Sequence, residues 1–317
     1  MKTIPSLDLQ DFLKGGDSKA RFVADLGAAY TEIGFVAVKN HGLSDELTTR
    51  LYDAVQRFFQ LPDDVKQKYE IPGLSGQRGY TGKGKEHAKN SNTGDLKEFY
   101  HVGQTVVGDD PIQKEYPANV FPTEIPEFQE LTLEAYKTLE AAGKQMLRAI
   151  ALYLQLDEFY FDSQIHHGNS ILRPIHYFPI ENPDVVPPDA VRSAEHEDIN
   201  LITLLMGASA EGLQVLNKQN EWVPITALPE QIVVNVGDML QRLTNNVLKS
   251  TTHRVVNPPR EKMNTSRYSI PFFLHPRSEM DLTCLAGCIT PENPLHYEPI
   301  SAGEYLNERL REIGLKK

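Results

Sequence analysis

Hydrophobic residues in the first half of the chain recur at the spacing of amphipathic helices. The pattern predicts a helix over 18–33 and a second helix that begins after Ser44, a residue suited to cap it. A longer helix is expected over 126–154, and a last one over 301–315 near the end of the chain. Between these segments, the Gly-, Lys- and Asn-rich stretch 71–97 is expected to form a long polar loop.

The pattern changes after about residue 170. Apolar runs of five to eight residues, rich in β-branched and aromatic side chains, alternate with Pro-, Gly- and Asn-rich turns. The runs are ILRPIHYF, INLITLLM, GLQVL, QIVVNV and RYSIPFFL. Many short strands without intervening helices favour an antiparallel sandwich or a jelly roll.

Composition and charge narrow the function classes. The 317 residues are 40% hydrophobic and 24% charged, as in ordinary globular proteins. The formal net charge of −11, without a Lys/Arg run, argues against nucleic acid or an anionic membrane as a partner. The N-terminal MKTIPSLDLQ lacks the apolar block of a signal peptide, and no stretch approaches the ~20 apolar residues of a membrane span. We expect a cytoplasmic protein in which Cys284 and Cys288 are small buried residues.

One tripeptide could bind a metal. His196-Glu197-Asp198 directly precedes an apolar run, and residues two apart in an extended chain point to the same face. His196 and Asp198 could therefore reach one ion together, with Glu197 pointing away. The β-rich segment THRVV could deliver His253 as a third ligand from another strand. Two His and one carboxylate on one face of an iron ion would leave positions open for a cosubstrate and O₂.

A second pair lies in the run RYSIPFFL. Arg267 and Ser269 are two residues apart and so share one face of the expected strand. A buried guanidinium beside a hydroxyl is suited to bind a carboxylate through two hydrogen bonds. A structural ion pair of Arg267 with an acidic side chain is the alternative.

The order His-x-Asp, then a further His, then Arg-x-Ser resembles the isopenicillin N synthase-like Fe(II)/2-oxoglutarate dioxygenases, which include plant flavonoid and gibberellin oxidases and bacterial relatives. Similar segments extend over residues 4–312, among them EIGFVAVKNHGLS, GLQVLNKQNEWVPI and YEPISAGEYLNERL. The resemblance implies a mainly β fold with flanking helices, built on a double-stranded β-helix (jelly-roll) core. Residues 1–110 would form a helical N-terminal region. Residues 111–317 would form the jelly-roll region with the long helix and the C-terminal helix, all in one compact unit.

The resemblance also implies roles for these residues. The iron ligands would be His196, Asp198 and His253. Arg267 and Ser269 would bind the distal carboxylate of 2-oxoglutarate.

A residue of the run ILRPIHYF is also expected at the cosubstrate. Tyr177 is the best match to a family residue that contacts 2-oxoglutarate, although the common Asn-Tyr-Tyr-Pro reads His176-Tyr177-Phe178-Pro179 here. This departure makes His176 either a substrate-pocket residue or a buried, hydrogen-bonded histidine.

The implied reaction uses Fe(II), 2-oxoglutarate and O₂ to oxidise, most often to hydroxylate, a C–H bond of a small molecule, with release of succinate and CO₂. In this family the substrate contacts variable segments, which points to Arg78–Tyr100 and Phe272–His275.

Two alternatives remain at this point. Isopenicillin N synthase and the ethylene-forming aminocyclopropane-carboxylate oxidase carry the same Arg-x-Ser, so the chain could be an Fe(II) oxidase or cyclase that consumes no 2-oxoglutarate. It could also be a non-catalytic, cupin-like metal-binding protein, although the five intact site residues argue against that function.

Overall fold

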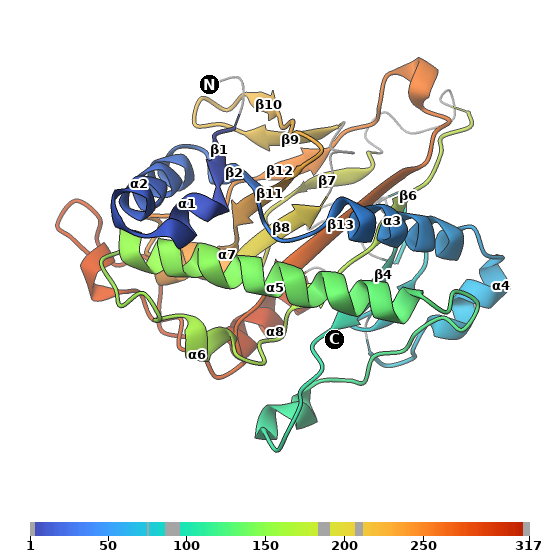
Figure 1. The fold of residues 1–317 in the computed structure, drawn as a ribbon, viewed down its shortest axis with the longest axis horizontal. Helices are drawn as coiled ribbons and strands as arrows, with labels where there is room; N and C mark the ends of the chain where they lie inside the picture. The colour runs from blue at the N-terminus through green and yellow to red at the C-terminus, as the bar shows by residue number, and fades with distance from the viewer. Residues whose placement is uncertain (1–3, 75, 86–95, 183–190, 207–211, 313–317) are drawn as a thin grey trace.

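The computed structural model describes residues 4–74, 76–85, 96–182, 191–206 and 212–312. Within them the strands form a nine-stranded and a four-stranded sheet (Figure 1). The large sheet has the order β1 (Ser6–Asp8), β2 (Phe35–Lys39), β11 (Gln231–Val236), β8 (Ile202–Met206), β13 (Arg267–Leu274), β5 (Ile171–Leu172), β4 (Lys97–Gly103) and β3 (Gly79–Thr81), with β6 (Ile175–Tyr177) paired to β13 and β4. The small sheet has the order β10 (Trp222–Pro224), β9 (Leu213–Leu216), β12 (His253–Val255) and β7 (Ser193–His196).

The pairing follows a jelly-roll topology. Neighbouring strands are antiparallel except for β1 and β2, and most neighbours are far apart in sequence. Strands that precede residue 110 extend the large sheet at both sides, because β2 pairs with β11 while β4 pairs with β5 and β6. The predicted jelly-roll core with flanking helices is confirmed.

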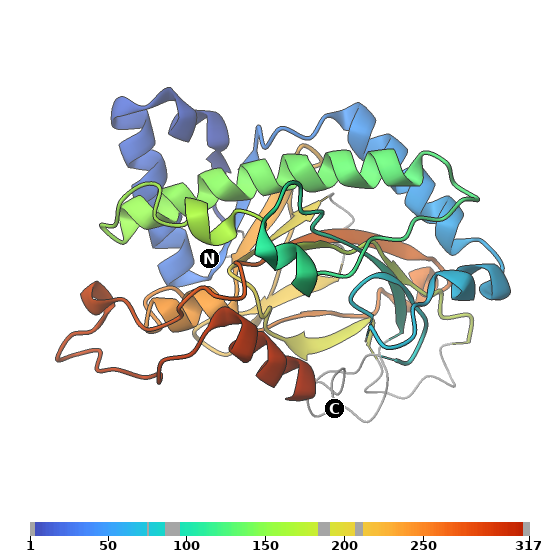
Figure 2. The same cartoon turned by 90° about the horizontal axis from the view of Figure 1, so that it is seen from below.

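Helices cover one face of the large sheet. They are α1 (Leu9–Lys14), α2 (Gly16–Glu32), α3 (Asp45–Phe59) and the long α5 (Phe128–Tyr153) (Figures 1 and 2). The other α-helices of the described chain are the short α4 (Asp63–Lys66), α6 (Asp162–Ile165) and α7 (Asp238–Leu243), and α8 (Ala302–Glu312). The four predicted helices are present with ends shifted by a few residues, and the predicted end of the last one lies outside the described residues. The short helices α1, α4, α6 and α7 were not predicted. The Ser44 side chain caps α3 by accepting from the Leu47 N–H.

Period-two alternation divides the apolar residues of the large sheet between two cores. In β11, Ile232, Val234 and Val236 face the helices, whereas Val233 faces the small sheet. Each fully buried large side chain contributes about 1.5–3 kcal/mol to these cores. The core between the two sheets is the smaller one, and the polar residues described below lie on its side of the strands.

One expectation about local structure is corrected. The polar stretch 71–97 is not loop throughout, because Gly79–Thr81 form the buried strand β3 and pair with β4; residues 75 and 86–95 lie outside the described residues. No helix in the described part of the chain is both long and apolar enough to cross a bilayer. Cys284 and Cys288 are buried, as predicted.

Candidate metal centre and cosubstrate pocket

The three candidate metal ligands converge at one end of the small sheet. His196 ends β7 and is the register partner of His253, the first residue of β12. The ring centroids lie 4.4 Å apart. Asp198, two residues beyond β7, places Oδ1 4.0 Å from Nε2 of His196 and 3.7 Å from Nε2 of His253. One ligand atom from each residue lies within 4.8 Å of the other two.

Backbone carbonyls orient both imidazoles. Nδ1 of His196 lies 2.8 Å from the Ala194 carbonyl oxygen, and Nδ1 of His253 lies 3.1 Å from that of Thr251. Each Nδ1–H therefore donates to a carbonyl, which leaves the Nε2 lone pair directed at Asp198.

Hydrogen bonds from two side chains orient the carboxylate of Asp198. Its Oδ2 accepts hydrogen bonds from Oγ1 of Thr203 at 2.7 Å and from Nδ2 of Asn235 at 2.8 Å, so Oδ1 is left for a cation. Burial alone would raise the pKa of Asp198, but the two histidines and these hydrogen bonds outweigh it and hold the pKa below its usual value.

The charge state of the site suits Fe(II). Burial lowers the pKa of His196 to about 4, and His253 and Lys97 act in the same direction, so the His196 imidazole is neutral near pH 7. One anionic oxygen and two imidazole nitrogens form the facial donor set of non-haem Fe(II) oxygenases. Glu197 points away, as predicted, and accepts a hydrogen bond from Thr252.

The expected carboxylate-binding residues lie together on the face of β13 and β6 that meets the small sheet. Arg267 is the register partner of Tyr177, and its guanidinium carbon lies 4.9 Å from the centre of the Tyr177 ring. Ser269 is the partner of Ile175, which packs between the two sheets. All three predicted side chains are buried.

His176 faces the opposite way. Its Nδ1 lies 2.7 Å from Oε1 of Glu98, its Nε2 lies 2.9 Å from Oγ of Ser266, and its ring stacks on Tyr268 at 4.8 Å. Of the two expectations for His176, a buried hydrogen-bonded histidine is the one confirmed.

Alternation also divides the segment Phe272–His275. Phe272 packs into the core beneath the helices. Phe273 is the register partner of Thr203, which hydrogen-bonds Asp198, so the Phe273 ring lies on the metal side of the sheet. The Arg173 guanidinium lies 5.0 Å from that ring and 4.5 Å from the ring of Phe99. Of the other predicted substrate segment, residues 86–95 lie outside the described residues.

Two residues of the metal centre were missed from the sequence. Asn235 is a polar residue within the apolar run QIVVNV, and this interruption is the one signal that could have indicated it. Thr203 carries no such signal, because β-branched residues are common in strands.

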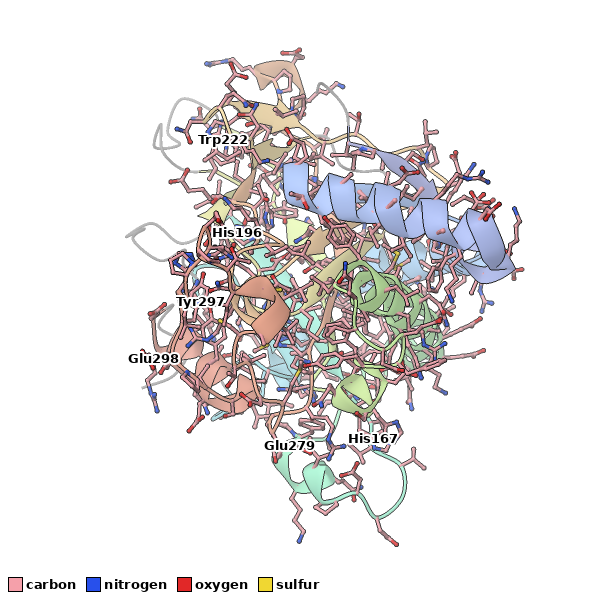
Figure 3. The ribbon with its side chains drawn as sticks, turned by 90° about the vertical axis from the view of Figure 1, so that its left-hand side faces the viewer. His167, His196, Trp222, Glu279, Tyr297 and Glu298 are labelled. Atoms are coloured by element: carbon pink, nitrogen blue, oxygen red, sulfur yellow. The ribbon has the colours of Figure 1, made fainter. Side chains whose placement is uncertain are left out.

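A second group of side chains that could bind a metal is instead paired with an arginine of the chain, Arg277. Asp110, His166 and His167 lie close together. Both carboxylate oxygens of Asp110 accept from Arg277, at 2.7 and 3.1 Å, which explains the group without a metal. In Figure 3, His167 lies in the lower part of the view, well apart from His196.

Comparisons with known proteins agree with this geometry. Residues 4–124 match the family model for the N-terminal region of a non-haem dioxygenase in morphine synthesis, and residues 168–276 match the 2OG-Fe(II) oxygenase superfamily. A 2-oxoglutarate-Fe(II) type oxidoreductase from Emericella nidulans is 30% identical over 94% of this chain and 86% of its own length.

Solved structures extend the similarity to the fold. A protein from Caulobacter crescentus, described as of the 2OG-Fe(II) oxygenase family, is 41% identical with a TM-score of 0.88 over 98% of this chain and 99% of its own. A full-length protein from Neurospora crassa, solved in complex with alpha-KG, is 31% identical with a TM-score of 0.84 over 97% of this chain and 96% of its own. These likenesses favour use of 2-oxoglutarate over the two alternatives from the sequence. The chain belongs to the 2OG-Fe(II) oxygenase superfamily and is an Fe(II)- and 2-oxoglutarate-dependent dioxygenase.

Proposed function

We propose that this dioxygenase hydroxylates a C–H bond of a small molecule, with iron bound by Nε2 of His196, Oδ1 of Asp198 and Nε2 of His253. The observation that carries the proposal is the convergence of these three atoms, each directed by a hydrogen bond on the far side of its group. Arg267, Ser269 and Tyr177 hold the distal carboxylate of 2-oxoglutarate.

The protein contributes placement and charge. Bound Fe(II) supplies the activation of O₂, and the overall reaction converts 2-oxoglutarate, O₂ and R–H into succinate, CO₂ and R–OH. Asp198 supplies the single negative charge of the ligand set, while Thr203 and Asn235 keep its Oδ2 from rotating toward the metal. The fork of Arg267 and the hydroxyl of Ser269 would hold one end of the cosubstrate, which would leave its other end to bind the iron.

The primary substrate is expected beside Phe273, on the same side of the sheet as Asp198. The half-buried Phe273 ring offers an apolar surface beside the Arg173 guanidinium, whereas the Phe99 ring is buried on the other side of that guanidinium. A small planar molecule suits such a surface. The Neurospora crassa protein, also solved with alpha-KG and thymine together, supports the same class of substrate. The net charge of −11 argues against a nucleic-acid partner.

The test is product stoichiometry. Protein reconstituted with Fe(II) without air is given O₂, 2-oxoglutarate and a panel of small planar molecules, including free pyrimidine bases. We expect one succinate for each O₂ consumed when a substrate is present, and one ¹⁸O atom from ¹⁸O₂ in the product. Equal turnover without 2-oxoglutarate would contradict the proposal.

A further inference from the structure

Arg192 is a buried cation that the reaction described above does not use. It lies directly before β7, four residues ahead of His196, and its side chain is 3% exposed. Its Nη2 donates to the carbonyl oxygen of Thr265 at 2.6 Å, whereas its Nε has no hydrogen-bond partner among the described residues. Guanidinium groups are seldom buried without an acceptor for most of their N–H groups.

The surroundings of Arg192 add positive charge instead of compensating for it. Thr265, which anchors the guanidinium, stands two residues before Arg267 in the chain. Burial lowers the pKa of Arg192, and Arg267 lowers it further; Tyr177 opposes this shift. No carboxylate within the described ranges contributes to the shift. A buried cation costs several kcal/mol unless an anion accompanies it.

We propose that Arg192 is a second guanidinium for the distal carboxylate of 2-oxoglutarate, acting beside Arg267. This inference rests on the proposed function. Arg192 donates to Thr265, two residues before Arg267, and Arg267 is the register partner of Tyr177; the proposed function places Arg267 and Tyr177 at that carboxylate. Two carboxylate oxygens offer about four acceptor positions, enough for donors from two guanidinium groups and a hydroxyl. The arriving anion would place a negative charge beside the Arg192 guanidinium, whose Nε has no hydrogen-bond partner among the described residues.

The experiment compares two ligands that share the chelating end. Mn(II) replaces iron so that no turnover occurs, and calorimetry measures the Kd of 2-oxoglutarate and of 2-oxopentanoate, which lacks the distal carboxylate. We expect Arg192→Gln to raise the Kd of 2-oxoglutarate by about 10- to 100-fold. The Kd of 2-oxopentanoate should stay unchanged. Arg192→Lys, which keeps the charge, should retain most of the affinity.

A matched control is available on the neighbouring strand. Arg254 lies on β12 with its guanidinium 3.9 Å from the centre of the Trp222 ring and its Nε bound to Gln214, on the face turned away from the metal centre. Arg254→Gln should change the Kd of neither ligand.

Thermal unfolding separates anion binding from a structural role. Without ligand, Arg192→Gln should melt no lower than the wild type, because it removes a buried charge next to Arg267, and 2-oxoglutarate should stabilise the variant less. A lower Tm, together with an equal loss of affinity for both ligands, would overturn the inference. Arg192 would then have the structural role of holding Thr265 in place. If Arg192→Gln prefers 2-oxoglutarate over 2-oxopentanoate as strongly as the wild type does, the inference is also overturned. Arg192 would then be available to bind a carboxylate of the primary substrate. If the wild type itself fails to prefer 2-oxoglutarate, the carboxylate pocket of the proposed function fails as well.

Discussion

The two faces of the strands β4, β6 and β13 differ in the partners of their buried charged side chains. Consecutive residues point to opposite sides, so Glu98 and His176 face the helices whereas Tyr177 and Arg267 face the small sheet. The helix-facing charges find their partners within the chain. On the inner face, the buried Arg192 instead has the guanidinium of Arg267 near enough to lower its pKa.

The helix-facing side is a closed network. Glu98 is 1% exposed, yet it accepts hydrogen bonds from Lys66, at 2.8 Å, from Tyr80 and from His176. Burial would raise the pKa of Glu98, but these three partners outweigh it and lower the pKa below the usual value. A buried charge with its partners in the chain indicates structure, whereas a buried cation such as Arg192, beside another cation, indicates a ligand.

The largest effect is expected at the metal centre. Asp198→Ala removes the single anionic ligand, so Fe(II) binding and succinate formation should both fall to background, as measured by metal analysis after dialysis and by turnover. Glu197→Gln is the matched control, because its side chain lies next in sequence but points away. Retention of iron by Asp198→Ala would contradict the ligand assignment.

The next effect concerns stability alone. Glu98→Ala removes the buried carboxylate of Lys66 and leaves its ammonium only the exposed carboxylate of Asp63, at 3.1 Å, among the described residues, so the free energy of unfolding in urea should fall by about 3–5 kcal/mol. Adding Lys66→Met to this variant should restore part of the loss, because the buried charge that has lost its buried partner is then gone. A fully stable Glu98→Ala with impaired 2-oxoglutarate binding would reverse the roles of the two faces.

Arg267→Gln tests the inner face. The variant should lose about 2–5 kcal/mol in kcat/KM for 2-oxoglutarate, through the lost carboxylate pairing. The free energy of unfolding without ligand should stay close to that of the wild type. A large loss of stability with unchanged kcat/KM would mean that Arg267 is structural.

The smallest effect depends on pH. Burial lowers the pKa of His275 to about 4, with Arg173 adding to the shift and Asp198 opposing it. The folded protein therefore holds His275 neutral, whereas the unfolded chain protonates it below its pKa of ~6.5. The contribution of neutral His275 to the free energy of unfolding is complete above that pH and is lost as the pH falls toward 4. Between pH 7 and 4.5, the free energy of unfolding of the metal-free wild type, measured in urea, should fall by about 2–3 kcal/mol more than that of His275→Gln. His196 titrates in both proteins, so parallel pH curves would show that His275 is not buried in its neutral form.

Much of this comparison could be predicted from local sequence. Spacing of two along a strand placed His196 with Asp198 and Arg267 with Ser269, because strand geometry alone sets which side chains share a face. The helices could be predicted in the same way, from apolar spacing and the Ser44 cap.

What could not be predicted depends on pairing between distant segments. Glu98 meets Lys66 across 32 positions, and Asn235 meets Asp198 across 37. Arg192 reaches Thr265 across 73. No local pattern encodes such contacts, since they follow from the order of strands in the sheets.

The most direct test of the metal and cosubstrate assignment is a crystal structure grown without air in the presence of Fe(II) and 2-oxoglutarate. We expect the anomalous signal of iron within about 2.2 Å of Nε2 of His196, Oδ1 of Asp198 and Nε2 of His253. The distal carboxylate of the cosubstrate should lie on the Arg267 fork. Iron bound elsewhere, or a cosubstrate whose far end lies away from Arg267, would contradict the account.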